Sequence, residues 1–254
     1  MASAGGRSRC EELIELCHEL GREDRGLAIL GEGNASTRAD RGFLVKASGA
    51  SLATLTAEGV VACRTEGLLA LMDSPDASDE QVEASLRTSR LDPAAPKPSV
   101  EAMFHAYLLS LPGIEWVGHA HPASANGILC SPRAAEFAGR RIFPDEVVCC
   151  GEESVFVPYV DPGLKLALEI RRRTEAFLEE KGTTPRVILL ANHGVITLGQ
   201  SAGAVLGVML MVQKAAEIWI SAASLGGPVF LGAGDVRRIA GRADEHYRRR
   251  ALNL

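Results

Sequence analysis

The stretch Gly118-His119-Ala120-His121-Pro122 decides most of what this sequence predicts. It follows residues 114–117 (Ile-Glu-Trp-Val), an apolar run that is typical of a buried strand. Alternate side chains of a strand point to the same side of a sheet, so the two histidines share one side. Two imidazoles at the end of one strand can bind a single metal ion.

A second histidine motif, Asn192-His193-Gly194, stands far downstream. It also follows an apolar, strand-like run, residues 187–191, so His193 can supply a third ligand. Three protein nitrogens with one open position are typical of a catalytic zinc site, whereas four ligands normally close a structural site. The chain has six histidines, and half of them fall in these two motifs. The alternative is that they are hydrogen-bonded core residues, because an H-x-H pair alone is a weak signal.

An acidic residue, Glu101, precedes the histidine pair on a predicted helix that Ser99 can cap. Glu101 and His105 are four residues apart and share a face of this helix that differs from its apolar face. Glu101 is either a carboxylate that moves protons beside a metal or a first-turn acid favoured by the helix dipole. We assign His105, like His18 and His246, to packing or to the surface.

Glycine-containing loops and a helix N-terminus offer backbone N–H groups that can bind an anionic substrate. The candidates are Gly33, Asn34, Ser48, Gly49 and Ser99. Ordinary turn chemistry is the alternative for the two glycines. Lys46 lies in a predicted strand over residues 43–47, where it either adds positive charge for a phosphate or carboxylate or is simply solvated.

Composition narrows the class of protein. The net charge of -5 argues against general nucleic-acid binding, which needs a basic face. The N-terminal residues lack the shape of a signal peptide, and the longest apolar run, residues 202–212, is too short to span a bilayer. The six cysteines show no C-x-x-C spacing and are interpreted as reduced thiols. We therefore expect a cytoplasmic protein with neither a nucleic-acid nor a membrane partner.

Two capping boxes, Ser8-x-x-Glu11 and Ser78-x-x-Gln81, predict the starts of helices. The second lies in the polar segment 72–97, which is rich in Pro, Asp and Ser. Such a segment is either a linker between domains or a long surface connection, and the capping box favours a connection that holds one short helix.

The remaining segments combine strand-like and helix-like patterns. We expect a meander of short strands over residues 142–160, helices over 164–180 and 201–221, and a charged C-terminal helix that ends near Tyr247. Because the strand content is clustered, these segments predict one α/β domain over residues 1–254, around a mixed or antiparallel central sheet.

Five motifs in order carry a family resemblance: Gly33-Asn34, Ser48-Gly49, Pro98-Ser99-x-Glu101, His119-x-His121-Pro122 and Asn192-His193-Gly194. Together they resemble the class II aldolase/adducin superfamily, from about residue 8 to residue 225. That superfamily includes fuculose- and rhamnulose-1-phosphate aldolases, ribulose-5-phosphate 4-epimerase, and related decarboxylases and dehydratases. Each motif alone is weak, and their order makes the resemblance specific. The stretch over residues 45–49, together with residues 99–101, looks most like the rhamnulose-phosphate branch.

The resemblance implies a three-layer α/β/α fold with a largely antiparallel sheet. It implies one Zn²⁺ per subunit on His119, His121 and His193, and a homotetramer with sites between subunits. It makes Glu101 the acid/base carboxylate. The loops at Gly33-Asn34, Ser48-Gly49 and Ser99 would then be the phosphate-binding elements.

Two positions depart from the family pattern, and a third residue is a candidate for a family feature. Sugar-phosphate aldolases of this type often carry two serines before the glutamate, and here the second is Val100. The fuculose-phosphate enzyme uses a tyrosine from a neighbouring subunit as a proton donor, whereas residues 143–146 read Phe-Pro-Asp-Glu. Either Asp145 or Glu146 replaces that tyrosine, or the protonation is arranged in another way. Tyr247 is a candidate for the family's C-terminal tyrosine that closes the site.

These features predict a zinc-dependent lyase that cleaves a ketose 1-phosphate, of rhamnulose or fuculose type, to dihydroxyacetone phosphate and an aldehyde. Epimerisation of a sugar phosphate at carbon 4, decarboxylation of a 3-keto sugar acid and dehydration are alternatives on the same metal site, with a small sugar phosphate or sugar acid as substrate. A non-catalytic adducin-like module is the alternative from a different class.

Overall fold

A seven-stranded sheet organises the computed structural model, which describes residues 7–242 and residue 244. The strand order is β3-β2-β1-β4-β7-β6-β5. The strands are β1 (Asn34–Ala39), β2 (Gly42–Lys46), β3 (Val60–Cys63), β4 (Trp116–Ala120), β5 (Val155–Val157), β6 (Val187–Leu190) and β7 (Gly194–Gly199). Both strand-like runs beside the histidine motifs are therefore strands, and β4 lies at the centre of the sheet.

Strand pairing is antiparallel everywhere except between β5 and β6, which pair in parallel at one edge. The register sets Asn34 of β1 opposite His119 of β4, and Ala120 of β4 opposite Val195 of β7. The mixed α/β class is as predicted, and the parallel edge pair qualifies the expectation of an antiparallel sheet.

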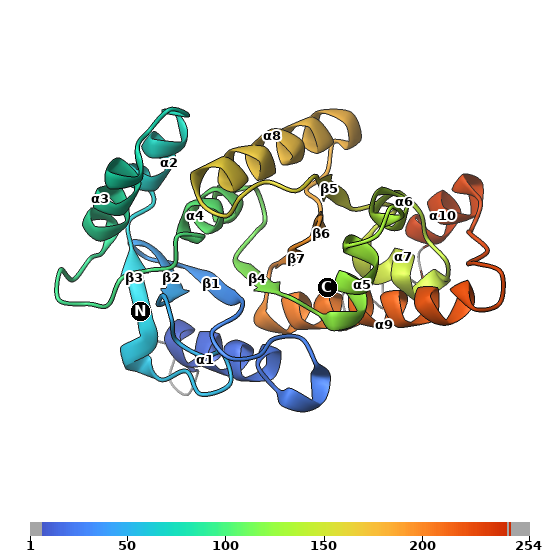
Figure 1. Cartoon of the computed structure of the whole chain (residues 1–254), viewed down its shortest axis with the longest axis horizontal. Helices are drawn as coiled ribbons and strands as arrows, with labels where there is room; N and C mark the ends of the chain where they lie inside the picture. Colours follow the sequence, from blue (N-terminus) through green and yellow to red (C-terminus); the bar gives the residue numbers. More distant parts are fainter. Residues whose placement is uncertain (1–6, 243, 245–254) are drawn as a thin grey trace.

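Helices pack on both faces of the sheet (Figure 1). One core cluster joins the sheet to α2 (Glu66–Met72), α4 (Ala102–Ser110) and α8 (Leu164–Lys181). The other joins it to α1 (Arg9–Leu20), α5 (Ala123–Leu129) and α9 (Ala202–Ala223). Strand alternation produces this division, because Val117 belongs to the first cluster and its neighbour Trp116 to the second. Three shorter helices, α6 (Ala134–Gly139), α7 (Pro144–Cys150) and α10 (Ala233–Ala240), gather at one end of the molecule.

Local signals placed several helix starts correctly. Ser8 and Glu11 form the predicted capping box of α1, and Ser78 and Gln81 form that of α3 (Asp79–Ser89). The segment 72–97 is a surface connection that contains α3 as its one helix, as expected. Tyr247 and His246 lie outside the described residues.

The predicted strand meander over residues 142–160 is wrong. Residues Pro144–Cys150 form helix α7, and only Val155–Val157 is a strand in this stretch. Pro144 occupies the first turn of the helix, where its missing N–H costs nothing, and Asp145 and Glu146 also lie in that turn. The β-branched Val147 and Val148 suggested a strand, but here they are buried against α10.

The helix predicted over residues 201–221 is α9, which is longer than the apolar run over residues 202–212. The helix continues past Gln213 and Lys214 to Ala223. The run alone is too short to span a bilayer, but the whole helix is long and apolar enough to do so, judged by length and composition only. Its buried face, from Ala204 to Trp219, packs against the sheet and neighbouring helices. That packing is typical of the core helix of a globular domain.

Candidate metal centre

The backbone brings three chain segments together at one end of the central strands. His119 lies on β4, and His121 follows that strand by one residue. His193 lies in the tight turn between β6 and β7, and β7 pairs with β4. The turn requires a left-handed residue, and Asn192 takes that conformation with φ 54°. The end of β4 brings His119 and His121 together, and the β6–β7 turn places the sequence-distant His193 beside them.

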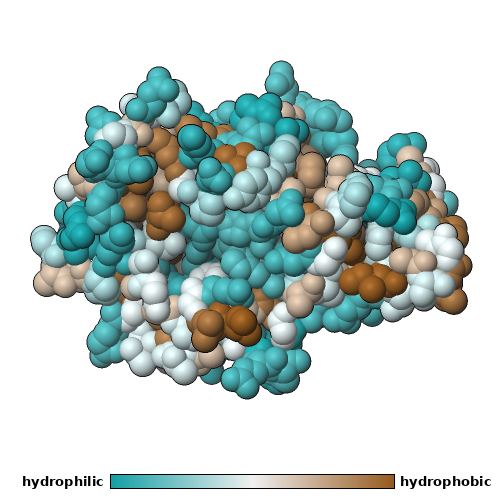
Figure 2. Space-filling view, viewed as in Figure 1, coloured by the Kyte–Doolittle hydropathy of each residue, from teal (hydrophilic) through white to brown (hydrophobic). Residues whose placement is uncertain are grey.

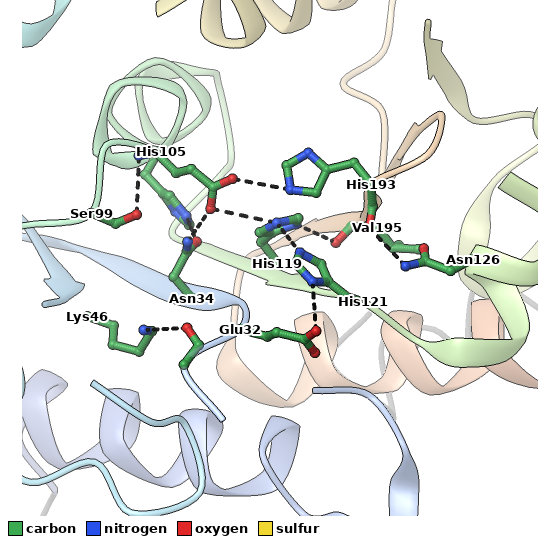
Figure 3. A network of polar contacts seen from close by, with 12 residues as sticks. Glu32, Asn34, Lys46, Ser99, His105, His119, His121, Asn126, His193 and Val195 are labelled. Carbon is green, nitrogen blue, oxygen red and sulfur yellow. Dashed lines mark hydrogen bonds and ion pairs between the residues drawn. The ribbon is translucent and has the colours of Figure 1, made fainter. Parts of the chain in front are cut away.

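The three imidazole rings face one another (Figure 3). Their centroids are 4.9, 5.0 and 5.1 Å apart, and one nitrogen of each ring lies within 4.8 Å of the others. The His119 ring is fully buried, whereas those of His193 and His121 are 14% and 21% exposed. The cluster is therefore accessible on the side of His121 and His193. The face of the molecule drawn in Figure 2 is hollowed near its middle, where hydrophilic residues line it.

Distances and protonation both fit a metal ion. Nitrogens bound at about 2.0–2.1 Å to one tetrahedral zinc lie about 3.3–3.4 Å apart. The Nε2 atoms of His119 and His121 are 3.1 Å apart. The Nδ1 atom of His119 lies 3.1 Å from the carbonyl oxygen of Val195 and can donate to it, which leaves Nε2 for the metal. Burial lowers the pKa of His119 and of His193, and so favours the neutral imidazole that a metal requires.

The carboxylate of Glu101 lies against two of the three histidines. Its Oε1 is 3.4 Å from Nε2 of His193, and its Oε2 is 3.7 Å from Nε2 of His119. Glu101 immediately precedes α4, and its backbone N–H donates to Oγ of Ser99 at 3.3 Å. The side chain is only 11% exposed, so little water competes for its oxygens. This carboxylate is placed to transfer a proton to or from a substrate bound at the histidines.

The comparison with known families decides the assignment. The sequence profile described as "Class II Aldolase and Adducin N-terminal domain" matches residues 11–220. This chain belongs to that family. The family match covers the three histidines and Glu101, so the resemblance carried by the sequence motifs is confirmed.

Relatives within the family carry different names. A Bacillus subtilis protein named uncharacterized oxidoreductase YuxG is 28% identical over 83% of this chain, which spans only 29% of that protein's length. A Haemophilus influenzae 3-oxo-tetronate 4-phosphate decarboxylase is 30% identical over 73% of this chain and 76% of its own length. The N-terminal class II aldolase domain of a Thermoplasma acidophilum protein superposes with a TM-score of 0.69 at 26% identity, over 87% and 97% of the two chains. A solved L-fuculose 1-phosphate aldolase shares the fold, with a TM-score of 0.70 at 19% identity, over 94% and 96%.

Two glycines of the family motifs are required by close contacts. A Cβ on Gly194 would lie 2.6 Å from the carbonyl oxygen of Ala120 and 2.6 Å from Cδ2 of His121. A Cβ on Gly33 would lie 2.6 Å from the carbonyl oxygen of His119, and Gly33 also has φ +67°. A side chain at either position would therefore displace the backbone or the ligands of the histidine cluster.

Two of the predicted anion-binding loops, those at Gly33-Asn34 and Ser48-Gly49, are linked by hydrogen bonds from Lys46. Its Nζ donates to the carbonyl oxygen of Ala50 at 2.6 Å and to that of Gly31 at 3.4 Å. The side chain is buried, so the interpretation of Lys46 as a solvated surface lysine is wrong. Burial lowers the pKa of Lys46, and the nearby Glu101 carboxylate opposes that effect. Ser48 and Gly49, at the tip of the second loop, are exposed, and Gly49 has φ +77°.

Sequence reasoning missed two groups of residues beside the histidines. Glu32 lies on the loop before β1, with Oε1 3.8 Å from Nδ1 of His121, and its other oxygen accepts from the Ile29 backbone N–H at 3.0 Å. His105, assigned to packing, contacts Asn34 within a buried polar network. The spacing of Glu101 and His105 contained a signal for the network, whereas nothing in the sequence marked Glu32 apart from its position in Gly31-Glu32-Gly33.

The structure places Val100 and Glu146, the residues at which the sequence departs from the family pattern. Val100 is partly buried and packs against the core cluster that contains α4. The carboxylate of Glu146 is buried, accepts from the Ile142 backbone N–H at 2.8 Å and lies 3.9 Å from the Arg141 guanidinium. Glu146 is thus engaged within its own chain, which argues against it as the replacement for the family tyrosine. Burial raises the pKa of this carboxyl group.

Proposed function

We propose that this chain is a metal-dependent carbon–carbon lyase that cleaves a ketose 1-phosphate, of rhamnulose or fuculose type, to dihydroxyacetone phosphate and an aldehyde. One observation carries the proposal: three converging imidazoles stand beside a carboxylate whose oxygens are 3.4 and 3.7 Å from two of them. A ligand set with an adjacent proton carrier is what bond cleavage next to a carbonyl requires. A non-catalytic module has no need of this arrangement.

His119, His121 and His193 would hold the metal, and three imidazoles suit Zn²⁺. A bound divalent metal supplies Lewis-acid stabilisation for the negative charge that develops on substrate oxygens as the bond breaks. The chain contributes orientation, because the Val195 carbonyl fixes the His119 ring and the Glu32 carboxylate faces Nδ1 of His121.

Glu101 handles the proton. When the bond between carbons 3 and 4 breaks, the electron pair remains on the three-carbon fragment, and the hydroxyl on carbon 4 loses its proton to become the aldehyde. The Glu101 carboxylate takes that proton and returns it to carbon 3 of the fragment from the side of His193, so it ends the reaction in its starting state. We propose Tyr247 as the C-terminal tyrosine that closes the site over the substrate. A Tyr247→Phe variant with unchanged turnover would remove that assignment.

Substrate binding is proposed for the two loops and the start of α4: Gly33, Asn34, Lys46, Ser48, Gly49 and Ser99. Support comes from the exposed tip at Ser48-Gly49 and from the buried Lys46 ammonium that joins the loops. Backbone N–H groups and one fixed positive charge favour an anion there. The hydroxyl of Ser99 already accepts from the Glu101 N–H, so it can donate its own hydrogen to a substrate oxygen.

A second candidate, decarboxylation of a 3-keto sugar acid phosphate, is favoured by one observation. The relative of that type, a 3-oxo-tetronate 4-phosphate decarboxylase, is 30% identical and matches along most of both chains. Loss of carbon dioxide leaves the same kind of negative charge beside an oxygen that cleavage of the aldol bond leaves. The same ligands and Glu101 would therefore serve either reaction.

A product assay separates these candidates. Zinc-loaded protein is incubated with L-rhamnulose 1-phosphate, L-fuculose 1-phosphate or a 3-oxo sugar acid phosphate, with and without a strong chelator. The proposal predicts chelator-sensitive release of dihydroxyacetone phosphate, and loss of most activity, about 10²- to 10⁴-fold, in a Glu101→Gln variant that retains its metal. Release of carbon dioxide without an aldehyde would establish the second candidate. No reaction with any of these substrates would reject both.

We also propose that the chain forms a homotetramer in which a neighbouring copy completes the site. Support comes from aliphatic side chains left exposed on the C-terminal part of α9 and the segment after it: Ile218, Ile220, Leu225 and Val229. Exposed groups of this kind often lie at protein interfaces. Light scattering coupled to size-exclusion chromatography tests this, and a monomer at micromolar concentration would contradict it.

A further inference from the structure

A row of polar side chains leads from Glu101 into the core, and Figure 3 shows two of its members, Asn34 and His105, beside each other. Oε2 of Glu101 accepts from Nδ2 of Asn34 at 2.5 Å. Oδ1 of Asn34 contacts Nε2 of His105, and Nδ1 of His105 lies 2.6 Å from Oγ of Ser36. Asn34, His105 and Ser36 are all buried. The row therefore has one end at the carboxylate beside the candidate metal ligands and the other in the core.

Strand geometry explains how these residues meet. Asn34 and Ser36 are two residues apart on β1, so their side chains point to the same face of the sheet. Asn34 pairs with His119 in the register of β1 and β4, which places its side chain beside the histidine cluster. Helix α4 packs on that face and carries His105 one turn after Glu101. Strand β1 therefore carries the Asn34 amide, and Glu101 and His105, at the start of α4 and on it, contact the two ends of that amide.

The direction of each hydrogen bond follows from the chemistry of the groups. A carboxylate only accepts, so the Asn34 NH₂ faces Glu101 and the Asn34 oxygen faces His105. Nε2 of His105 must then carry the proton, because an amide oxygen cannot donate. Nδ1 of the neutral ring is left as an acceptor, and the Ser36 hydroxyl donates to it. Every bond points toward Glu101, and a ring with its proton on Nδ1 would lose the bond to the Asn34 oxygen and reverse the bond to Ser36.

Packing alone does not account for an imidazole here. All but one of the nine residues of α4 are buried, and the other buried side chains of this helix are Ala, Met, Phe, Leu and one Tyr. Burying a polar ring among them is unfavourable unless both nitrogens are hydrogen-bonded. Both are bonded, and the partner of one is the amide that contacts Glu101.

We propose that His105 is a positioning residue for the acid/base carboxylate: through Asn34 it holds Oε2 of Glu101, so that Oε1 faces His193. The Asn34 oxygen selects the tautomer that this requires, and the Ser36 hydroxyl donates to the nitrogen that this tautomer leaves as an acceptor. Asn34, the first residue of β1, thereby serves the proton carrier in addition to any contact it makes with substrate. The inference rests on the proposed function for its catalytic meaning and on the hydrogen-bond network for its structural content.

The first test compares His105→Leu with His105→Gln in zinc-loaded protein. Glutamine can place an N–H near the position of Nε2, whereas leucine cannot. We expect His105→Leu to lower kcat about 10- to 100-fold, as loss of an outer hydrogen-bond partner does at other sites, with KM and zinc stoichiometry near those of the wild type. His105→Gln should recover most of that loss. The matched control is Tyr107→Phe, which removes a buried polar atom from the same helix on the side facing Arg171 of α8.

The second test needs no substrate and so separates this inference from the proposed function. ¹⁵N NMR of the wild type should show His105 protonated at Nε2 and not at Nδ1, and Ser36→Ala should weaken that preference. A crystal structure of His105→Leu should show the Glu101 carboxylate displaced from His193. A proton on Nδ1, an unmoved carboxylate or wild-type kcat in His105→Leu would each overturn the proposal. If His105→Leu does not fold, Ser36→Ala and His105→Gln decide by the same criteria, since Ser36→Ala should lower kcat.

Discussion

Gly194→Ala is a one-atom change that tests whether the histidine motif requires glycine for steric reasons. Gly194 begins β7 and pairs with Leu190 of β6. A Cβ there would lie 2.6 Å from the Ala120 carbonyl oxygen and 2.6 Å from Cδ2 of His121. One of these contacts is backbone in the central strand of the sheet, so it cannot be relieved by a rotamer change. The other is the ring of a proposed ligand.

The displacement sets the size of the effect. To reach ordinary van der Waals contact near 3.4 Å, each neighbour must move by about 0.8 Å. Overpacking of this kind destabilises a fold by about 1–3 kcal/mol. A shift of the His121 ring by the same distance should also raise the Kd for zinc, about 10- to 100-fold, as disturbance of ligand orientation does elsewhere.

Urea unfolding of the metal-free protein and competition with a fluorescent zinc chelator measure the two effects separately. The expected change in unfolding midpoint is roughly 0.3–1 M urea. Gly67→Ala is the control, because a Cβ on this exposed helical residue meets no described atom within 4 Å and should leave stability unchanged or raise it by up to about 1 kcal/mol. If Gly194→Ala matched the wild type in both assays, the steric explanation of the motif would be wrong.

Two other perturbations follow from contacts of the site. Glu32→Gln should raise the Kd for zinc about 10-fold. The effect is at the low end for such a residue because the Glu32 carboxylate is half exposed and 3.8 Å from Nδ1 of His121. Equal zinc affinity of variant and wild type in the competition assay would contradict this. Burial lowers the pKa of His105 and of His119 in the folded protein, so the unfolded chain binds more protons than the folded one below about pH 6.5. Metal-free protein should therefore lose stability as the pH falls below that value, by up to about 1.4 kcal/mol per pH unit for each buried neutral histidine. Urea midpoints that stay constant between pH 7.5 and 5.5 would argue against neutral histidines at both positions.

The sequence predicted the parts of the site that depend on strand periodicity. His119 and His121 are two residues apart at the end of an apolar run, and alternation alone places them on one side. His193 follows a similar run, β6, and β7 after it pairs with β4, so the turn that carries His193 lies beside the end of β4. The helix after Ser99 was also predicted, but it begins at Ala102, so Glu101 directly precedes the helix and does not lie in its first turn, and Ser99 does not cap it.

Other parts depended on packing that no local pattern encodes. Val147 and Val148 favour a strand by propensity, yet α10 covers them and they form part of a helix. The burial of Lys46 follows from carbonyl groups of two loops that are distant in the sequence. His105 could be assigned a partner only once the register of β1 placed Asn34 within reach.

One measurement tests the central claim most directly: the zinc stoichiometry and ligand environment of the purified protein, determined by metal analysis and X-ray absorption. The account predicts one zinc per chain with three imidazole nitrogens at about 2.0–2.1 Å, and loss of the metal in His119→Ala and His193→Ala variants that remain folded. A folded protein that binds no divalent metal, or one that binds zinc equally well without His193, would contradict the account.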